Sequence, residues 1–353
     1  MIKIFMEPSD SYQKFWGKLS PAYPISKGEF RLPIATSLFD LPNKKADELS
    51  KNLVEILDLL LKQHGTKESA ITRAYEAGEG RIIPLITDEF TGVVRFDCII
   101  DSTTDEFKIL EINCDYPDGL ILHDKTYSAL KDEDLSLHEN LLTELFDKDK
   151  AIAILHSKKA TFVDGYHAEK IALEKMFKDV EIGSDINYTV PKIIRRCLEV
   201  SKLSEADIKQ SASLPHKYIN TFSLRTLGYK NLLSEIDHSY VPKTISLNKE
   251  NLDEFLIEKD RWVIKPIEGC EGNGIYFGKD NSDEGWRDIL EQVIETPYIA
   301  QEFISISKQK VEFYEDGGIS ERELYFDICP YFFIKNGKVI GNGHTLMRFQ
   351  KIR

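Results

Sequence analysis

Cysteine is scarce in this chain, and no apolar run is long enough to cross a membrane. The five cysteines include no Cys-x-x-Cys pair, so neither a zinc site nor a disulfide framework is indicated. Reduced thiols in a cytoplasm are therefore expected. Every apolar run falls short of roughly 18 residues, and Glu7 interrupts the N-terminal segment before the apolar core of a signal peptide can form. A membrane partner is not expected.

Basic residues are outnumbered by acidic ones. The chain has 46 lysines and arginines against 59 aspartates and glutamates, a net charge of −13. A chain this acidic is not expected to bind nucleic acid over a broad surface, whereas a local basic pocket for a small phosphate ligand is compatible with it. Glycine and proline, 20 and 13 residues, are too few for a low-complexity protein. The 353 residues suffice for two or three lobes of roughly 150 residues, or for one large α/β body.

The first half of the chain mixes helical and strand patterns. Apolar periodicity predicts a helix over 46–62 and two strands, 93–100 and 107–112, that pair as a hairpin across the polar turn 101–106. The strand–helix–strand order over 151–182 is typical of an open α/β layer. We therefore expect a boundary between two structural units near residue 150.

The second half has the pattern of an α+β structure with antiparallel strands. A helix is predicted over 224–236, and apolar strands over 261–266 and 298–304. Asn336-Gly337 lies between two apolar runs and predicts a two-residue hairpin turn.

A lysine followed by spaced glycines is the first motif with chemical meaning. Lys265 lies near the end of an apolar strand, and Gly269, Gly272 and Gly274 follow before the next strand. Glycines let backbone N–H groups approach phosphate oxygens, and lysine supplies a positive charge. Neither the P-loop nor the dinucleotide fingerprint fits, because no Gly-Lys-Ser/Thr follows and a strand comes next. Taken alone, the pattern also fits a flexible hairpin with an exposed lysine.

Polar pairs interrupt the two strands of the predicted hairpin. Arg95 and Asp97 share one face of their strand, and Glu111 and Asn113 share one face of theirs. Carboxylate and amide oxygens suit Mg²⁺, and an arginine beside them suits a phosphoryl or carboxylate group. The alternative is a solvated polar face on a half-exposed hairpin.

The third motif is the strand segment Gln301-Glu302-Phe303-Ile304. Its backbone could contact the edge of an adenine ring. By itself it fits an ordinary core strand better.

Together the three motifs resemble the ATP-grasp superfamily, in which a strand lysine precedes a glycine-rich phosphate lid. In that family a Gln-Glu-x-Ile strand forms the adenine hinge, and a Glu-x-Asn pair holds Mg²⁺. Here Glu111-Ile-Asn113 comes before Lys265, an order similar to the circularly permuted branch that includes glutathionylspermidine synthase. The resemblance extends over residues 93–348.

Two further positions match this family, and one departs from it. Lys230, in Gly-Tyr-Lys, matches an earlier lysine that opens a helix, and Arg348 ends a segment similar to the closing hairpin. The family's Asp-Thr-Pro-Thr stretch reads Asp115-Tyr-Pro-Asp118 here, which puts the substrate side in doubt.

The resemblance implies a mixed α+β and α/β fold, a circularly permuted ATP-grasp with a small α/β layer of the pre-ATP-grasp type. Residues 1–92 are expected to pack on the body and help form the substrate pocket, and 93–150 to carry the metal-binding strands. Residues 151–220 would form the α/β layer, and 221–353 the nucleotide-binding lobes with their glycine-rich lid.

The resemblance also implies roles for individual residues. The expected ATP-binding residues are Lys230, Lys265, Gly269, Gly272, Gly274, Gln301, Glu302, Phe303 and Ile304. The expected Mg²⁺ ligands are Asp97, Glu111 and Asn113, and the expected catalytic residues are Arg95 and Arg348. The implied activity is an ATP-dependent, ADP-forming ligation of a carboxylate to an amine through an acyl-phosphate.

Two other functions are compatible with the same nucleotide site. A small-molecule kinase would use the same geometry, and so would a nucleotide-binding module without turnover. The substrates, a small-molecule or peptide carboxylate and an amine, are not identified by the sequence, nor is the oligomeric state. His123 and Asp124 are candidates for lining the acceptor pocket. His344, beside Arg348, could contact substrate, although a lone histidine is more often a partly buried polar residue.

Overall fold

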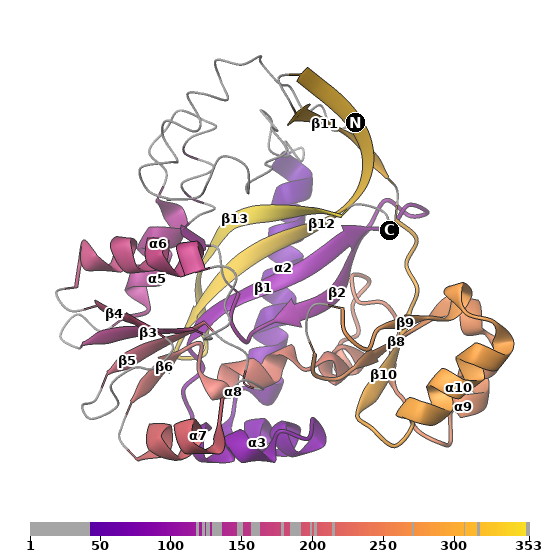
Figure 1. Ribbon diagram of the computed structural model, residues 1–353, viewed down its shortest axis with the longest axis horizontal. Coiled ribbons are helices and arrows are strands. Elements are labelled where there is room, and N and C mark those ends of the chain that lie inside the picture. The colour runs from indigo at the N-terminus through magenta and orange to yellow at the C-terminus, as the bar shows by residue number, and fades with distance from the viewer. Residues whose placement is uncertain are drawn as a thin grey trace.

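The computed structural model describes residues 43–350 except for short segments. The segments left out are 118–119, 122–123, 125–127, 129–135, 147–150, 157–162, 178–179, 184–191, 198–199, 201–202, 214–215, 270–271, 307 and 316–317. The described strands form three sheets, which Figure 1 shows side by side with helices around them. The first 42 residues, which belong to the predicted substrate-pocket region 1–92, lie outside the described part.

The central sheet is antiparallel and joins segments far apart in the sequence. Its members are β1 (Gly92–Ile100), β2 (Phe107–Asn113), β11 (Gln309–Glu315), β12 (Gly318–Lys335) and β13 (Lys338–Gln350). Their order is β11-β12-β1-β2, with β13 paired along β12. The predicted β1–β2 hairpin is confirmed. Because β1 also pairs with β12, the strands of the predicted metal site share a sheet with the C-terminal segment.

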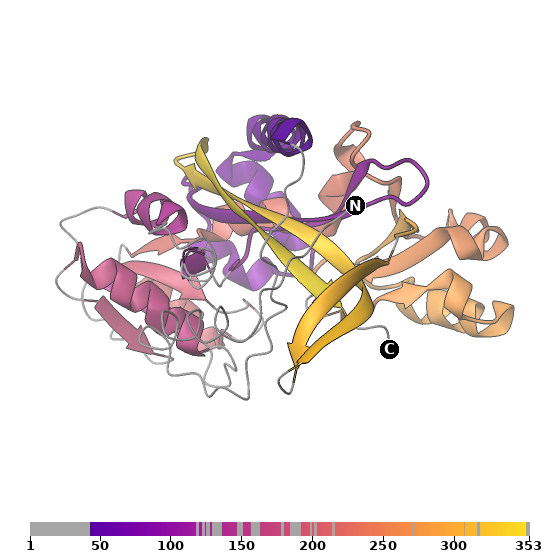
Figure 2. The same ribbon diagram turned by 90° about the horizontal axis from the view of Figure 1, so that it is seen from above.

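One face of this sheet is apolar and packs against α2 (Asn43–His64), which contains the predicted helix. Leu53 and Leu57 on the helix meet Phe96 on β1 and Phe332 on β12 in one buried cluster. Figure 2 shows α2 along one side of the sheet. Since Phe96 points toward α2, its neighbours Arg95 and Asp97 face the opposite side. Helix α3 (Lys67–Glu76) and η1 (Gly80–Leu85) follow α2.

A parallel sheet lies beside the central one and confirms the predicted α/β layer. Its order is β4 (Val180–Gly183), β3 (Ile152–His156), β5 (Ile193–Cys197) and β6 (Lys217–Ile219). The helices of this region are α5 (Leu137–Glu144), α6 (Val163–Glu174) and α7 (Glu205–Ala212).

A smaller antiparallel sheet forms the lobe on the other side. Its order is β7 (Thr244–Ser246), β10 (Tyr298–Glu302), β8 (Trp262–Pro266) and β9 (Tyr276–Phe277). Helices α9 (Leu252–Ile257) and α10 (Asp283–Val293) cover it, with η5 (Lys259–Arg261) and η6 (Gly278–Asp280) at its turns. Its core packs three aromatic side chains, Phe255, Trp262 and Trp286, among smaller aliphatic ones.

The helix predicted over 224–236 is wrong as a continuous element. The chain forms α8 (Phe222–Arg225), η3 (Thr226–Gly228) and η4 (Lys230–Glu235) instead. Gly228 passes so close to β2 that a Cβ there would lie 2.8 Å from the carbonyl oxygen of Ile112. Tyr229 then takes an extended conformation, with φ −66° and ψ 129°. The break therefore places Lys230 against the edge of the central sheet.

The predicted hairpin turn at Asn336-Gly337 is confirmed. Both residues have positive φ, 51° and 71°, as a type I′ turn requires. The strands β12 and β13 that it joins are longer than the apolar runs alone predict. Within the described residues, no helix is long and apolar enough to cross a membrane.

Candidate active site

The pairing of β1 with β2 brings the four predicted polar residues of the hairpin together. Asp97 is the register partner of Glu111, and Arg95 is the partner of Asn113. Arg95 binds Asp97 with two hydrogen bonds, Nε to Oδ1 at 2.7 Å and Nη2 to Oδ2 at 3.0 Å. Arg95 and Asp97 are both buried. The alternative of a solvated polar face is therefore wrong for this pair.

The two predicted lysines meet this hairpin, Lys230 from η4 and Lys265 from β8 of the smaller sheet. Nζ of Lys230 lies 3.5 Å from Oε2 of Glu111 and donates to the carbonyl of Gly269 at 3.2 Å. Nζ of Lys265 donates to Oε1 of Gln301 at 2.6 Å and also acts electrostatically on Glu111. Both lysine side chains are buried, so Lys265 is not the exposed lysine of a flexible hairpin.

Burial and like charges shift the pKa values of Glu111 and Lys265 in opposite directions. Burial raises the pKa of Glu111 and the nearby Asp97 raises it further, against the opposing effect of Lys230. Burial lowers the pKa of Lys265 to about 8, and Lys230 lowers it further, against the opposing effect of Glu111. The carboxylates of Asp97 and Glu111 thus repel each other, and the ammonium groups of Lys230 and Lys265 do the same. Such a cluster gains from a bound cation beside the carboxylates and a bound anion beside the lysines.

The donor set fits a magnesium ion. Two carboxylates and one amide, from Asp97, Glu111 and Asn113, provide hard oxygen ligands, and Mg²⁺ takes its remaining ligands from water and substrate phosphates. Across the described part of the chain, no group of three or more His, Cys, Asp or Glu side chains is arranged to hold a metal. A metal at this place would thus depend on phosphate oxygens as well as on the protein.

The predicted glycines bracket a turn between β8 and β9. Gly272 and Gly274 have φ of +74° and +72°, where side chains are disfavoured. A Cβ at Gly274 would also lie 2.7 Å from the hydroxyl of Tyr298. Residues 270–271, between Gly269 and Gly272, lie outside the described part. Gly272 and Gly274 therefore allow backbone conformations in which other residues would be strained.

The predicted hinge lies on β10 and just beyond it. Gln301 is buried and its amide Nε2 donates to Thr244 Oγ1 at 3.3 Å, while its Oε1 holds Lys265. Glu302 pairs with Arg261 at 3.3 Å. The Phe303 ring has Nζ of Lys279 at 4.0 Å from its centroid. Ile304 follows the strand and is partly buried. Their contact with adenine stays a prediction.

Arg348 lies on β13, where its register partner is Asp327 on β12. Its side chain lies outside the described part, so its catalytic role stays a prediction.

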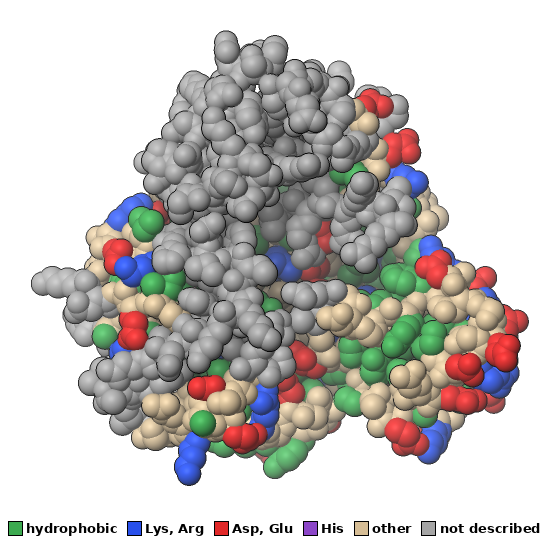
Figure 3. Space-filling view, in the orientation of Figure 1, with side chains coloured by type: hydrophobic (Ala, Val, Ile, Leu, Met, Phe, Trp, Pro, Cys, Tyr) green, Lys and Arg blue, Asp and Glu red, His purple; other side chains and the backbone are tan. Residues whose placement is uncertain are grey.

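The molecular surface is hollowed near the middle of the face in Figure 3, where basic and acidic side chains gather and hydrophobic ones border them on the lobe side.

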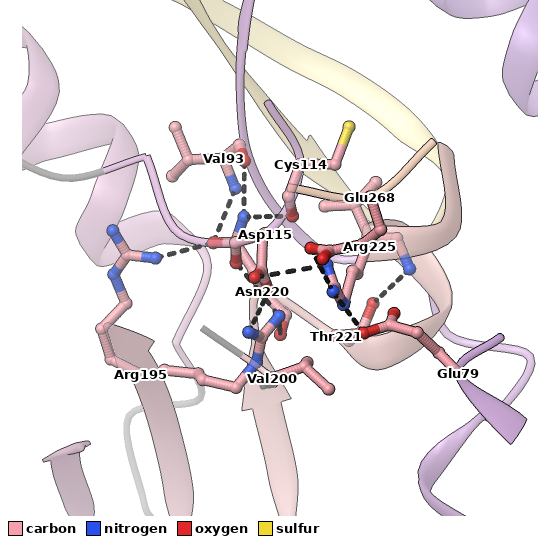
Figure 4. A network of polar contacts seen from close by, with 12 residues as sticks. Glu79, Val93, Cys114, Asp115, Arg195, Val200, Asn220, Thr221, Arg225 and Glu268 are labelled. Carbon is pink, nitrogen blue, oxygen red and sulfur yellow. Dashed lines mark hydrogen bonds and ion pairs between the residues drawn. The ribbon is translucent and has the colours of Figure 1, made fainter. Parts of the chain in front are cut away.

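A buried network behind the site was not predicted from the sequence. Nη2 of Arg225 lies 2.7 Å from Oε1 of Glu79 and 2.7 Å from Oε1 of Glu268, and Nη1 lies 3.3 Å from Oδ2 of Asp115 (Figure 4). Asp115 follows Glu111 on the chain, and Glu268 precedes Gly269. Arg225 thus ties the end of β2 to the start of the glycine segment.

A second part of this network holds the parallel sheet against β1. Asn220 donates through Nδ2 to the carbonyls of Val93 at 2.6 Å and Cys114 at 2.9 Å. Its Oδ1 accepts from Nη1 of Arg195 at 2.6 Å. The only sequence signal for either part was a charged residue inside an apolar segment, which does not reveal its partners.

Comparisons with known proteins agree with this geometry. Residues 230–310 match the family described as the prokaryotic glutathione synthetase ATP-grasp domain. The chain is also similar to the solved structure of a glutathione synthetase-like effector (GSS30) from Globodera pallida in its apo form. The TM-score is 0.56, at 13% identity, over 96% of this chain and 93% of that chain. The chain has an ATP-grasp fold. A search of curated proteins found no match.

The ATP-grasp fold is the fold that the resemblance of the three sequence motifs implies. The matched region contains Lys230, Lys265, the three glycines and the hinge strand, whereas Glu111 and Asn113 lie outside it. The circularly permuted order, the particular likeness to glutathionylspermidine synthase and the domain boundaries stay predictions.

Proposed function

We propose that this ATP-grasp protein is an ATP-dependent carboxylate–amine ligase that forms an amide or peptide bond. The observation that carries the proposal is the meeting of two buried lysines, from η4 and from β8, with the Arg95–Asp97 and Glu111 side chains of the central sheet. The match to a glutathione synthetase ATP-grasp domain supports a ligase in preference to other ATP-dependent reactions.

The charges of the site residues suggest which of them bind phosphate and which bind Mg²⁺. Lys230 and Lys265 would bind the phosphates of ATP, and the glycine segment would close over them and exclude water. Asp97, Glu111 and Asn113 would hold Mg²⁺, which supplies charge neutralisation of the phosphates when bound.

Arg95 is placed to bind the transferring phosphoryl group, since Asp97 fixes its guanidinium in a rigid, buried position. Arg348 would assist it from β13. A substrate carboxylate oxygen would take the γ-phosphoryl group as ADP leaves. The amine nitrogen would then form a bond to the acyl carbon, and the bond from that carbon to the phosphate oxygen would break, releasing inorganic phosphate and a proton.

Calorimetric binding of the ATP analogue AMP-PNP with Mg²⁺ tests the nucleotide site. We expect binding to wild type, and a loss of affinity of at least about tenfold in Lys265→Ala and Glu111→Gln. The matched controls are Lys249→Ala and Glu295→Gln. These two residues form an ion pair whose side chains are 73% and 70% exposed, in contrast to the buried cluster. No binding to wild type, or equal binding by all five proteins, would overturn the site.

Product analysis then separates the ligase from its alternatives. Amino acids and dipeptides, γ-glutamylcysteine among them, serve as carboxylates, with glycine, other amino acids and polyamines as amines. A ligase releases ADP only with both substrates, and hydroxylamine traps its acyl-phosphate as a hydroxamate. A kinase releases ADP with one substrate and yields a stable phosphate ester. A binding module releases no ADP.

A further inference from the structure

Three described side chains form a polar cluster on the same sheet face as Arg95. Asp124 and His138 are fully buried, and the His344 side chain is 21% exposed. His138 is in the first turn of α5, and His344 is on β13. Oδ1 of Asp124 lies 3.2 Å from Nδ1 of His138 and 3.9 Å from Nε2 of His344. We call these three residues the Asp124 cluster.

One carboxylate oxygen of this cluster lacks a hydrogen-bond donor. Oδ2 of Asp124 accepts from the backbone N–H of Glu139 at 2.9 Å. Oδ1 is buried, and no donor within the described part of the chain bonds to it. The backbone N–H of His138 also hydrogen-bonds to the Asp124 carboxylate. The His138 ring does not bond to Oδ1, because its Nδ1 is directed at the carbonyl of Leu120, 3.0 Å away. An orphaned buried carboxylate oxygen costs free energy unless a ligand supplies a donor.

No lysine or arginine of the described residues forms an ion pair with Asp124. Among the described residues, the only basic groups within ion-pair distance of Asp124 are the two histidines. Burial lowers the pKa of His138 to about 4 and also lowers the pKa of His344, so both rings are neutral at pH 7. Burial raises the pKa of Asp124 to about 6, which leaves it largely ionised. The neighbouring Glu139 is acidic and is paired with Lys175 at 2.6 Å.

The cluster borders the proposed site of acyl transfer. The His138 ring lies 5.3 Å from the Tyr331 ring and 5.3 Å from the His344 ring, between centroids. Tyr331 is the register partner of Arg95. A group bound by Asp124 and His344 is thus one aromatic side chain away from the arginine that would hold the phosphoryl group.

The spacing of the two acceptors suits a single ammonium group. Two acceptors that share one ammonium nitrogen at about 2.8–2.9 Å stand about 4.6–4.7 Å apart at the tetrahedral angle and about 4 Å apart at an angle of 90°. The 3.9 Å between Oδ1 of Asp124 and Nε2 of His344 is close to this range and is too long for a direct hydrogen bond between them. We propose that the Asp124 cluster binds the primary ammonium group of the acceptor substrate, an inference that rests on the proposed ligase function.

Nuclear magnetic resonance of protein labelled with ¹⁵N in its eight histidine rings tests this site directly. His344→Gln and His138→Gln assign the two ring signals. Methylammonium chloride is the probe, and tetramethylammonium chloride at equal concentration is the control, since it carries the same charge but has no N–H. We expect a saturable shift of the His344 signal with methylammonium, with a midpoint in the millimolar range.

Two variants make the test specific. Asp124→Asn is expected to abolish the shift, whereas Asp101→Asn, at another buried aspartate, is expected to leave it unchanged. AMP-PNP binding to each protein verifies that it is folded. The absence of a saturable shift in wild type, or an equal shift with tetramethylammonium, would overturn the ammonium site. Loss of AMP-PNP binding by wild type with the shift retained would instead overturn the proposed function.

Discussion

Nζ of Lys265 on β8 lies 2.6 Å from Oε1 of Gln301 on β10, so a neutral amide holds this buried ammonium group. Glu111 acts on it electrostatically and also lies 3.5 Å from Nζ of Lys230. The pKa of Lys265 falls to about 8 as a result of burial and of the second lysine. A negatively charged ligand beside Lys265 would therefore stabilise its ammonium form.

The lowered pKa of Lys265 predicts a pH dependence of nucleotide binding. Lys265 is charged below pH 8 and neutral above it, and only the charged form attracts phosphate. Affinity for AMP-PNP and Mg²⁺ should therefore fall as the pH rises from 7 to 9.5, by up to about tenfold per unit above pH 8. Calorimetry at several pH values measures this fall. Lys265→Ala should lose it, and an equal slope in that variant would assign the effect to another group.

Arg225 is predicted to be among the most important charged residues for stability. Removing it by Arg225→Met leaves Glu79, Asp115 and Glu268 without their shared cation, and breaking a buried ion pair costs about 3–5 kcal/mol. Urea unfolding measures the loss. The control is Arg261→Met, since Arg261 pairs with Glu258 at the surface, where a pair contributes about 0–1 kcal/mol. Similar losses in both variants would contradict the buried network.

Much of the fold and of the primary site follows from local pattern. Alternation along β1 places Arg95 and Asp97 on one face, and the short polar turn after it makes the pairing with β2 nearly unavoidable. The turn at Asn336-Gly337 is likewise set by two residues that tolerate positive φ. These features depend on neighbours in the sequence, so the sequence predicts them.

The parts that escaped prediction depend on contacts between distant segments. The break at Gly228 arises from a close approach to Ile112, and helical periodicity alone carries no trace of it. Arg225 gathers acids from three separate segments. The Asp124 cluster similarly combines β13, α5 and the segment after β2. A single charged letter in each segment does not reveal which partners the fold will give it.

The glycines of the lid segment allow two causes of strain to be separated. Gly272→Ala introduces unfavourable backbone strain without a clash, since φ is +74° and no atom of the described residues lies within 4 Å of the new Cβ. A cost of about 1 kcal/mol corresponds to about fivefold weaker AMP-PNP binding. Gly274→Ala adds a 2.7 Å contact with the Tyr298 hydroxyl and should weaken binding further. Tyr298→Phe in that background should restore the part due to contact; failure to restore it would contradict the steric cause.

Asp124 should destabilise the free protein, as expected of a residue kept for binding. Its folded-state pKa of about 6 lies above the model-peptide value of 3.8, so the cost of its charge is full above pH 6 and disappears below about pH 4. Asp124→Asn should therefore raise the free energy of unfolding at pH 7.5 by about 1–2 kcal/mol and have little effect near pH 4. Asp101→Asn should do the reverse at pH 7.5, because Asp101 accepts from Thr103 at 2.8 and 2.7 Å and an amide oxygen accepts less strongly than a carboxylate. Urea unfolding of wild type and the two variants at both pH values measures these differences. If Asp124→Asn were less stable than wild type at pH 7.5, the Asp124 carboxylate would already be compensated within the fold, and the argument for a cationic ligand would fail.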